Sequence, residues 1–238
     1  MNINQTCPLV LQDLYFYDIK SCYYQLSEAA NFNLEGIDKD NKVERNIALG
    51  MEQIDNPNFQ KYLQETSESI IDYYLFENRI TDSEVILKQR DGFIITRLLD
   101  DNNSVMKLDF REHINWFIMT TDRSKYMTIS DDVGVTVKGM PNQYSGIQKI
   151  YEKFKDLNFY HKKGLFKQLK NLKNDFFLSE DMDIFMIEKN KSKLIISKRH
   201  GLLEIKEGVT FSGKTIDRQK YYDLYLREFI DSLILQFY

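Results

Sequence analysis

Asp18 and Asp91 are the two side chains of this chain that are best placed to bind a metal ion. Asp18 follows the aromatic-rich run 14–17, whose residue types favour an extended strand. Asp91 lies between two short β-prone stretches within residues 84–96, and Asp91-Gly92 is typical of a tight hairpin turn. Taken singly, each aspartate also fits a purely local role, because Asp is favoured at turns and at helix N-caps.

Carboxylates at the ends of adjacent strands suit phosphoryl and nucleotidyl transfer. These reactions use hard cations bound by oxygen, often two ions roughly 3.5–4 Å apart that stabilise the attacking and leaving oxygens. Cys7 and Cys22 are too few for a disulfide framework or a Cys-based zinc site, and the three histidines lack the H-x-x-x-H spacing of a His-based site. We therefore expect Mg²⁺ or Mn²⁺, bound by Asp18 and Asp91.

The elements that must position these aspartates are predicted to mix strands and helices, so the fold class expected is α+β. Before Pro141 the pattern predicts a strand at 9–18, one or two helices within 42–78, a hairpin at 84–98, a helix at 105–120 and two strands within 125–138. A helix break is expected near Asn56-Pro57, because Pro disfavours helix in the residue before it. After Pro141 the pattern predicts helices at 144–156 and 164–175, strands at 183–188, 192–198 and 202–206, and a final helix at 217–237 with Asp217 as its N-cap.

Length and composition fit one or two domains with a real core, since 42% of the 238 residues are hydrophobic. No apolar run reaches the ~18 residues needed to cross a bilayer, and the first residues show no secretory signal pattern. We therefore expect no membrane partner and a cytoplasmic location, in a bacterium or a phage-infected host.

The net charge of −4 hides a basic region. Residues 138–200 contain 14 Lys and Arg against 7 Asp and Glu, so the rest of the chain is strongly acidic. Within 161–173, a helix would turn three leucines inward and four lysines outward, which is either an ordinary solvated face or a surface that tracks phosphates without reading base sequence. The leucines are Leu165, Leu169 and Leu172, and the lysines are Lys163, Lys167, Lys170 and Lys173.

The residues that follow Asp18 resemble a motif of the palm of family B DNA polymerases. The first motif of that family has the form Asp-x-x-Ser-Leu-Tyr-Pro, and this chain has Asp18-Ile-Lys-Ser21-Cys22-Tyr23-Tyr24. Asp, Ser and Tyr match, whereas Leu and Pro do not.

Two further motifs of the family are met in part. The second, Lys-x-x-x-Asn-Ser-x-Tyr-Gly, is similar to the segment that holds Lys42, Asn46 and Gly50, although its Ser and Tyr are replaced. The third, Tyr-x-Asp-Thr-Asp-Ser, aligns with its second Asp at Asp91 and with Gln89 at the first. Short matches at 107–109, 123–126 and 137–139 keep the order of the family, so the resemblance covers about residues 10–140.

The resemblance implies a palm at 1–140, formed by an antiparallel sheet with helices packed on one face. Reduced fingers would lie at about 25–56, because only 24 residues separate Asp18 from Lys42. A thumb-like, partly basic region of small α/β architecture would follow at 141–238. Since the chain begins close to the first motif, no 3′–5′ exonuclease domain is expected.

The resemblance also implies roles for individual residues. Asp18 and Asp91 would bind two catalytic metal ions, and Tyr23 would exclude a ribose 2′-OH. The incoming nucleotide would contact Ser21, Cys22, Tyr23, Lys42, Arg45, Asn46 and Gly50. The primer-template duplex would contact Lys125, Tyr126, Lys138 and Gly139, together with Lys163, Lys167, Lys170 and Lys173 of the reduced thumb.

The function expected is template-directed DNA polymerisation from dNTP, by a minimal enzyme or by one subunit of a split enzyme whose other functions lie on a second protein. Two alternatives remain open. The chain could be a palm-derived nucleic-acid-binding or structural subunit that has lost catalysis, because Gln89 replaces an acidic residue. It could also transfer nucleotides without a template, or to a protein primer.

Overall fold

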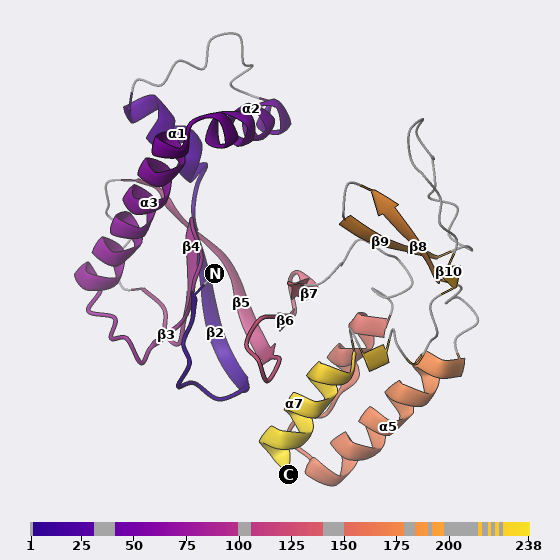
Figure 1. The fold of residues 1–238 in the computed structure, drawn as a ribbon. Helices are drawn as coiled ribbons and strands as arrows, with labels where there is room; N and C mark the ends of the chain where they lie inside the picture. Colours follow the sequence, from indigo (N-terminus) through magenta and orange to yellow (C-terminus); the bar gives the residue numbers. More distant parts are fainter. Residues whose placement is uncertain are drawn as a thin grey trace. The chain divides into compact units, whose positions relative to one another are not determined.

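The computed structural model describes residues 2–30, 41–99, 106–139, 150–178, 184–189, 192–197, 214–215, 219, 222–223 and 226–238. These residues form a mixed architecture of helices and antiparallel strands, which confirms the α+β class (Figure 1). The main sheet has seven strands in the order β1-β3-β4-β2-β5-β6-β7, and a small sheet has the order β10-β8-β9. None of the helices in the described ranges is long and apolar enough to cross a membrane.

The strands of the main sheet are β1 (Asn2–Ile3), β2 (Val10–Ile19), β3 (Val85–Lys88), β4 (Gly92–Ile95), β5 (Leu108–Met119), β6 (Tyr126–Ser130) and β7 (Gly134–Lys138). The small sheet contains β8 (Ile184–Lys189), β9 (Ser192–Ser197) and β10 (Lys214–Thr215). The helices are α1 (Cys22–Ala29), α2 (Lys42–Asp55), α3 (Pro57–Glu77), α5 (Lys162–Leu178) and α7 (Arg227–Phe237), with a 3₁₀ turn, η1 (Lys153–Asp156).

The chain forms two compact units. Unit 1 comprises residues 1–7 and 13–113, and unit 2 comprises residues 8–12 and 114–238. Strands β2 and β5 contribute to both units, and β6 and β7 belong to unit 2. This division differs from the expected boundary near residue 140, because the buried side chains of β6 and β7 pack with those of α5 and α7.

The core of unit 1 lies between its helices and one face of the sheet. Tyr17 and Ile19 are two positions apart on β2, so their side chains lie on the same face of the sheet and pack in one core with Phe93. The ring of Phe93 stacks on that of Tyr17, with centroids 5.6 Å apart. Leu63 and Ile71 of α3, both fully buried, cover this face. Helices α1 and α2 both pack against α3 (Figure 1). Each such buried side chain contributes about 1.5–3 kcal/mol to folding, so α3 holds the sheet and the two shorter helices together.

The helix break predicted near Asn56-Pro57 is confirmed. Asn41 caps α2, since its side chain accepts hydrogen bonds from the N–H groups of Val43 and Glu44. Asn56 ends α2 and caps α3, accepting from the N–H of Phe59, and Pro57 occupies the first turn of α3. Pro suits that position because the first-turn N–H has no partner within the helix.

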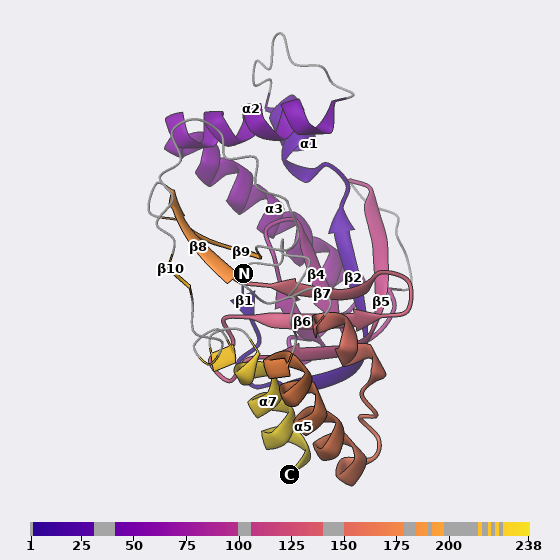
Figure 2. The same cartoon turned by 90° about the vertical axis from the view of Figure 1, so that its right-hand side faces the viewer.

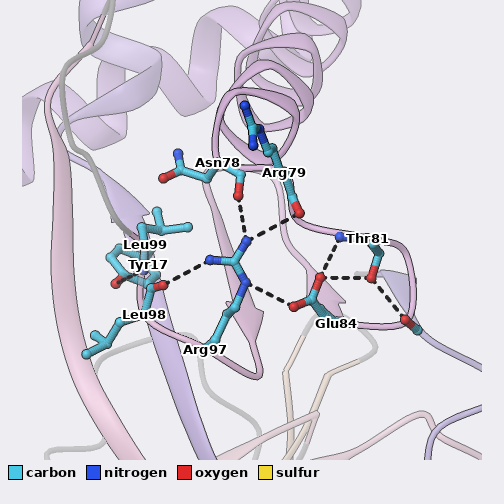
Figure 3. Close-up of polar contacts among 9 residues, drawn as sticks. Tyr17, Asn78, Arg79, Thr81, Glu84, Arg97, Leu98 and Leu99 are labelled. Carbon is cyan, nitrogen blue, oxygen red and sulfur yellow. Dashed lines mark hydrogen bonds and ion pairs between the residues drawn. The ribbon is translucent and has the colours of Figure 1, made fainter.

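The open end of the β3–β4 hairpin is clamped to the end of α3 by Arg97 (Figure 3). Arg97 donates from Nε to Glu84 Oε1 at 3.0 Å, and from Nη2 to the carbonyl oxygens of Asn78 at 2.6 Å and Arg79 at 3.3 Å. Glu84 also accepts from the N–H and the hydroxyl of Thr81, both at 2.8 Å. These bonds set the direction of the hairpin, whose opposite end carries Asp91.

The Arg97 clamp makes a pH-dependent contribution to stability. The hydrogen bonds from Thr81 and the Arg97 guanidinium lower the pKa of Glu84. A lowered pKa in the folded state adds stability at neutral pH, and this stability is lost as the pH falls through that pKa. We expect Glu84→Gln to lower Tm at pH 7 and to approach the wild type in acid, as measured by thermal melts across pH. Glu65→Gln is the control, because the Lys61–Glu65 pair is exposed at both ends, and an equal loss of Tm there would contradict the argument.

The prediction of a helix at 105–120 is wrong, because residues 108–119 form strand β5. The Lys20 N–H donates to Lys107 O at one end of β5, and the Met119 N–H donates to Leu9 O at the other, so β5 lies antiparallel to β2. The sheet overrides the predicted helical conformation, since β5 lies between β2 and β6 and buries Phe117 fully.

The remaining predictions fall mainly in unit 2. The two strands within 125–138 are confirmed as β6 and β7, and the two strands near 183–198 as β8 and β9. Helix α5 confirms the helix at 164–175, and it buries Leu165, Leu169 and Leu172 as expected. Residues 150–152 are helical and continue into η1, whereas the rest of 144–156, the strand at 202–206 and Asp217 lie outside the described residues. The final helix is described from Arg227.

Candidate functional site

Unit 1 contains a pocket of about 600 Å³ at the end of β2 and the start of α1. It brings together most of the residues that the sequence assigned to catalysis and nucleotide binding. The predicted residues that line it are Asp18, Ser21, Cys22, Tyr23, Arg45, Asn46 and Asp91. Segments from β2, α1, α2 and the β3–β4 turn therefore converge on one cavity.

Asp18 and Asp91 are brought together by the pairing of β2 with β4. The two strands are antiparallel, with Asp18 opposite Gly92, and the Ile19 N–H donates to the carbonyl oxygen of Asp91 at 2.7 Å. Asp91 follows Arg90 in the turn of the predicted hairpin, so its side chain extends from the tip next to the end of β2. The hairpin prediction is confirmed, and its tip is at the pocket.

Gly92 allows this close pairing. A Cβ at position 92 would lie 2.6 Å from the Tyr17 carbonyl oxygen and 3.4 Å from the Asp18 Cα. Both contacts are with backbone, which cannot rotate away as a side chain can. Its φ is not in the left-handed region, so the need for glycine comes from the approach of β2 and not from turn geometry.

The carboxylates of Asp18 and Asp91 share one electrostatic environment. Partial removal from water raises the pKa of Asp91, and the Asp18 carboxylate raises it further. Burial of the Cys22 thiol, with Asp91 and Asp18 adding to the effect, raises the pKa of Cys22 to about 12. Both carboxylates therefore face the start of α1, close enough together for each to oppose further negative charge.

Cys22 gives a test of this convergence that does not depend on activity. In a Cys7→Ser background, we expect the folded protein to show no thiolate absorbance near pH 9, whereas an ordinary cysteine with a pKa of about 8.5 is mostly ionised there. Asp91→Asn should lower the pKa of Cys22, because it removes a negative charge beside the thiol. Full ionisation of Cys22 near pH 9 in the parent protein would contradict the burial of the thiol, and an unchanged pKa of Cys22 in Asp91→Asn would contradict the proximity of the Asp91 carboxylate.

The pocket lining includes residues to which the sequence assigned no role, among them Asp109 and Arg111 of β5. Arg111 donates to Asp18 Oδ2 from Nε at 3.0 Å and from Nη2 at 2.6 Å. Both Arg111 nitrogens donate to Oδ2, so Oδ1 of Asp18 takes part in neither of these two hydrogen bonds. Asp109 and Arg111 are two positions apart on β5 and so lie on one face of the strand. The spacing of two residues would have indicated a shared face if the segment had been predicted as a strand. In the predicted helix at 105–120 these two residues lie on different faces.

The predicted nucleotide-binding residues occupy distinct positions around the pocket. Ser21 precedes α1 in a left-handed conformation, with φ 50°, and its side chain makes no capping hydrogen bond. The Arg45 guanidinium lies over the Tyr24 ring at 4.7 Å. Lys42 begins α2, but its side chain lies outside the description. Gly50 is not part of the pocket lining, and a Cβ there would meet nothing within 4 Å.

The donor types at the pocket suit a hard cation. Asp18, Asp91 and Asp109 supply carboxylate oxygens, the ligands that Mg²⁺ and Mn²⁺ prefer. The pKa of Asp91 is raised mainly by its partial removal from water and to a smaller extent by the Asp18 carboxylate, and a bound cation would offset both effects. Within the described ranges, no three His, Cys, Asp or Glu side chains form a group that could hold a metal ion. Mg²⁺ sites in proteins often have only one or two carboxylate ligands, with waters or substrate phosphates completing the shell.

The predicted duplex-binding residues divide into structural and exposed groups. Tyr126 is buried and stacks on Phe117 at 4.9 Å, so its ring packs the sheet and offers no surface to a ligand. Lys125 is paired with Glu228 at 2.7 Å. Lys138 and Gly139, after the last strand of the main sheet, are exposed, and so are the four predicted lysines of α5. Lys173 lies over the Tyr222 ring at 5.1 Å.

No model of a known protein family matches this chain, and no curated protein is significantly similar to it. The class of this protein can therefore be described only by its fold and by the residues of its pocket. This class is an α+β protein whose antiparallel sheet presents two aspartates to a cavity at the start of a helix.

Proposed function

We propose that this chain is a nucleotidyltransferase of the polymerase type, which adds a nucleotide from dNTP to a primer 3′-OH on a DNA template. One observation carries the proposal: the pairing of β2 with β4 brings Asp18 and Asp91 into one pocket. The palm resemblance, taken from the sequence, assigns metal binding to the same two residues. The order of the sequence motifs, which resembles that of the family B palm, supports the proposal.

In the proposed complex, different residues of the pocket bind the metal ions and the phosphate groups of the triphosphate. Asp18 and Asp91 would hold Mg²⁺ ions, which when bound neutralise phosphate charge and lower the pKa of a primer hydroxyl. The Ser21 side chain does not cap α1, and in the proposed complex N–H groups at the start of this helix would donate to phosphate oxygens at the positive end of the helix dipole. Arg45 is held over Tyr24 beside the same space and adds positive charge to it.

The side chains on either side of the phosphates would orient the sugar and base. Tyr23 is half-buried, and burial raises its pKa to about 12, so its hydroxyl stays neutral. In the proposed complex Tyr23 lies under the sugar and excludes a 2′-OH. Asn46, on the face of α2 that lines the pocket, would contact the nascent base pair.

The test is extension of a labelled primer on a DNA template by the purified chain with Mg²⁺ or Mn²⁺. Template-dependent extension supports the proposal. Equal extension without a template would support the template-independent alternative. No extension at any concentration of either metal, with primer-template still bound, would favour the second function considered next.

A second function, a nucleic-acid-binding subunit without catalysis, is favoured by one contact. Arg111 makes two hydrogen bonds to Asp18 and neutralises a carboxylate that a catalytic site would use for metal. Gln89, in place of an acidic residue, reduces the ligand set further. If this function holds, Arg111→Ala should leave primer-template binding unchanged, and no variant of Asp18 should affect it.

The proposed partner subunit has a candidate docking surface on α2. Four apolar side chains with helical spacing are between 57% and 80% exposed, and they form the α2 stripe: Val43, Ile47, Met51 and Ile54. Exposed Glu44 and Asp55 flank one side of the stripe. A second copy packed antiparallel would place Glu44 near Asp55 of the first, so like charges would oppose it. The charges favour a different chain whose apolar helix carries basic residues.

A further inference from the structure

A group of aromatic rings gathers at the start of α5 in unit 2. Tyr160 is 81% exposed, and its ring packs edge-on against Trp116 at 5.4 Å. Trp116 stacks on buried Phe159 at 4.4 Å. A second pair, Phe166 and Tyr238, lies nearby on α5 and at the end of α7, with ring centroids 5.4 Å apart and both rings exposed. Helices α5 and α7 run side by side in Figure 2.

The loop that carries Tyr160 is held in place by hydrogen bonds. Asn158 Oδ1 accepts from the Tyr160 N–H at 3.1 Å, and the Asn158 N–H donates to Gln168 Oε1 at 2.9 Å. His161 Nδ1 accepts from the Gly164 N–H at 3.1 Å and so caps α5. The Tyr160 ring is therefore presented to solvent by a fixed backbone, and ordering it on binding a ligand costs little entropy.

The surface around these rings is positively charged. Helix α5 contains five lysines and one acidic residue, Asp175, which is paired with Lys153 at 2.7 Å. The lysines of its first three turns are exposed and take part in no ion pair within the described parts of the chain. They are Lys162, Lys163, Lys167 and Lys170. The helix N-terminus adds positive potential at the same end, so an anion is favoured there.

We propose that this aromatic–lysine surface, formed by Tyr160, Phe166, Lys162, Lys163 and Lys167, binds single-stranded nucleic acid. An unpaired base stacks on the exposed face of Tyr160, and the lysines of α5 contact the neighbouring phosphates. Rings that are exposed beside unpaired cations suit this ligand, because a stacked base covers apolar area while the backbone neutralises the charge. A duplex suits it less, since its base faces are already stacked on one another.

The inference goes beyond the proposed function, which concerns a primer-template at the pocket of unit 1. It rests on α5 and its neighbouring loop, and it does not require Asp18 or Asp91 to bind metal. A template strand downstream of a primer is one source of single strand in a polymerase, and a displaced strand is another. The same chemistry serves both.

The chain supplies its own probe for the test, because Trp116 is its only tryptophan. We expect an oligo-dT of about 12 nucleotides, a length within the usual range for such sites, to quench Trp116 fluorescence on titration into the full chain. The affinity is measured by anisotropy of the labelled oligonucleotide and should weaken with salt, with a slope that reports about three phosphate contacts. A duplex of equal length should bind at least about fivefold more weakly.

Variants separate stacking from charge. Tyr160→Ala should weaken oligo-dT binding about tenfold, with the salt slope unchanged, because stacking on one base is lost. Lys163→Gln combined with Lys167→Gln should weaken binding and reduce the salt slope. The matched controls are Tyr73→Ala, a 44% exposed tyrosine of α3, and Lys61→Gln, an exposed lysine of the same helix, and both should bind as the parent does.

Measurements in the Asp91→Asn background keep the two proposals apart. Oligo-dT binding that survives in this variant supports the surface even if primer extension is never observed. The inference is overturned if Tyr160→Ala binds oligo-dT as tightly as the parent protein. It is equally overturned if duplex is preferred over single strand, or if the surface binds vesicles of anionic phospholipid and no oligonucleotide.

Discussion

If the proposed function holds, Asp91→Asn and Asp18→Asn should each reduce metal-dependent primer extension by at least about 10³-fold, because each would remove a charged oxygen ligand that contributes several kcal/mol to the transition state. Neither change should unfold the protein. Asp91 is an exposed residue in a turn, and Asn has the same shape as Asp. Asp18 is paired with Arg111, whose side chain is 42% exposed and can be solvated when the carboxylate is lost.

The measurement is single-turnover extension of a labelled primer, together with thermal melts of each variant. Asp132→Asn is the control, since Asp132 is an exposed aspartate in the turn between β6 and β7 of unit 2. Asp109→Asn gives a graded comparison, because Asp109 lines the pocket without direct pairing to β4. Extension that persists in either the Asp18 or the Asp91 variant would contradict the assignment of that residue as a metal ligand.

Gly92→Ala should have the second largest effect, on stability and activity together. The added methyl group would lie 2.6 Å from the Tyr17 carbonyl oxygen, so β2 and β4 must move apart. Overpacking of this kind costs roughly 1–3 kcal/mol in the free energy of unfolding. It also changes the separation of Asp18 and Asp91, and a displacement of about 1 Å can reduce a rate about 10²-fold.

Gly50→Ala is the matched control for this glycine. Position 50 lies within α2, and its Cβ would meet nothing within 4 Å, so alanine should stabilise the helix by about 0.5–1 kcal/mol. Chemical denaturation measures both changes, and primer extension measures their effect on activity. Unchanged unfolding in Gly92→Ala would mean that β2 and β4 do not approach as closely as the structure shows. Loss of extension in Gly50→Ala with unfolding unimpaired would support the predicted contact of Gly50 with the incoming nucleotide.

The sequence by itself determined the elements whose signals are local. Asn56-Pro57 separates two helices because both residues act through their own backbone, and the leucines of α5 are buried because helical spacing places them on one face. Asp91-Gly92 marked the hairpin for a similar reason, although Gly92 is required by its partner strand and not by the turn. Asp18 and Asp91 were expected to lie at one site because each follows a strand-like run, and both line the same pocket.

Only the tertiary structure decided which strands neighbour one another and what their side chains meet. Residues 108–119 form a strand because β2 and β6 pair with them, and no local pattern contains that information. Once β5 is placed, Arg111 reaches Asp18 from a position 93 residues later in the chain. Tyr126 illustrates the same limit, since its sequence context suggested a ligand contact and its burial against Phe117 makes it part of the core. Contacts between distant segments depend on the packing of the whole sheet, whereas caps, turns and helical faces depend on residues a few positions apart.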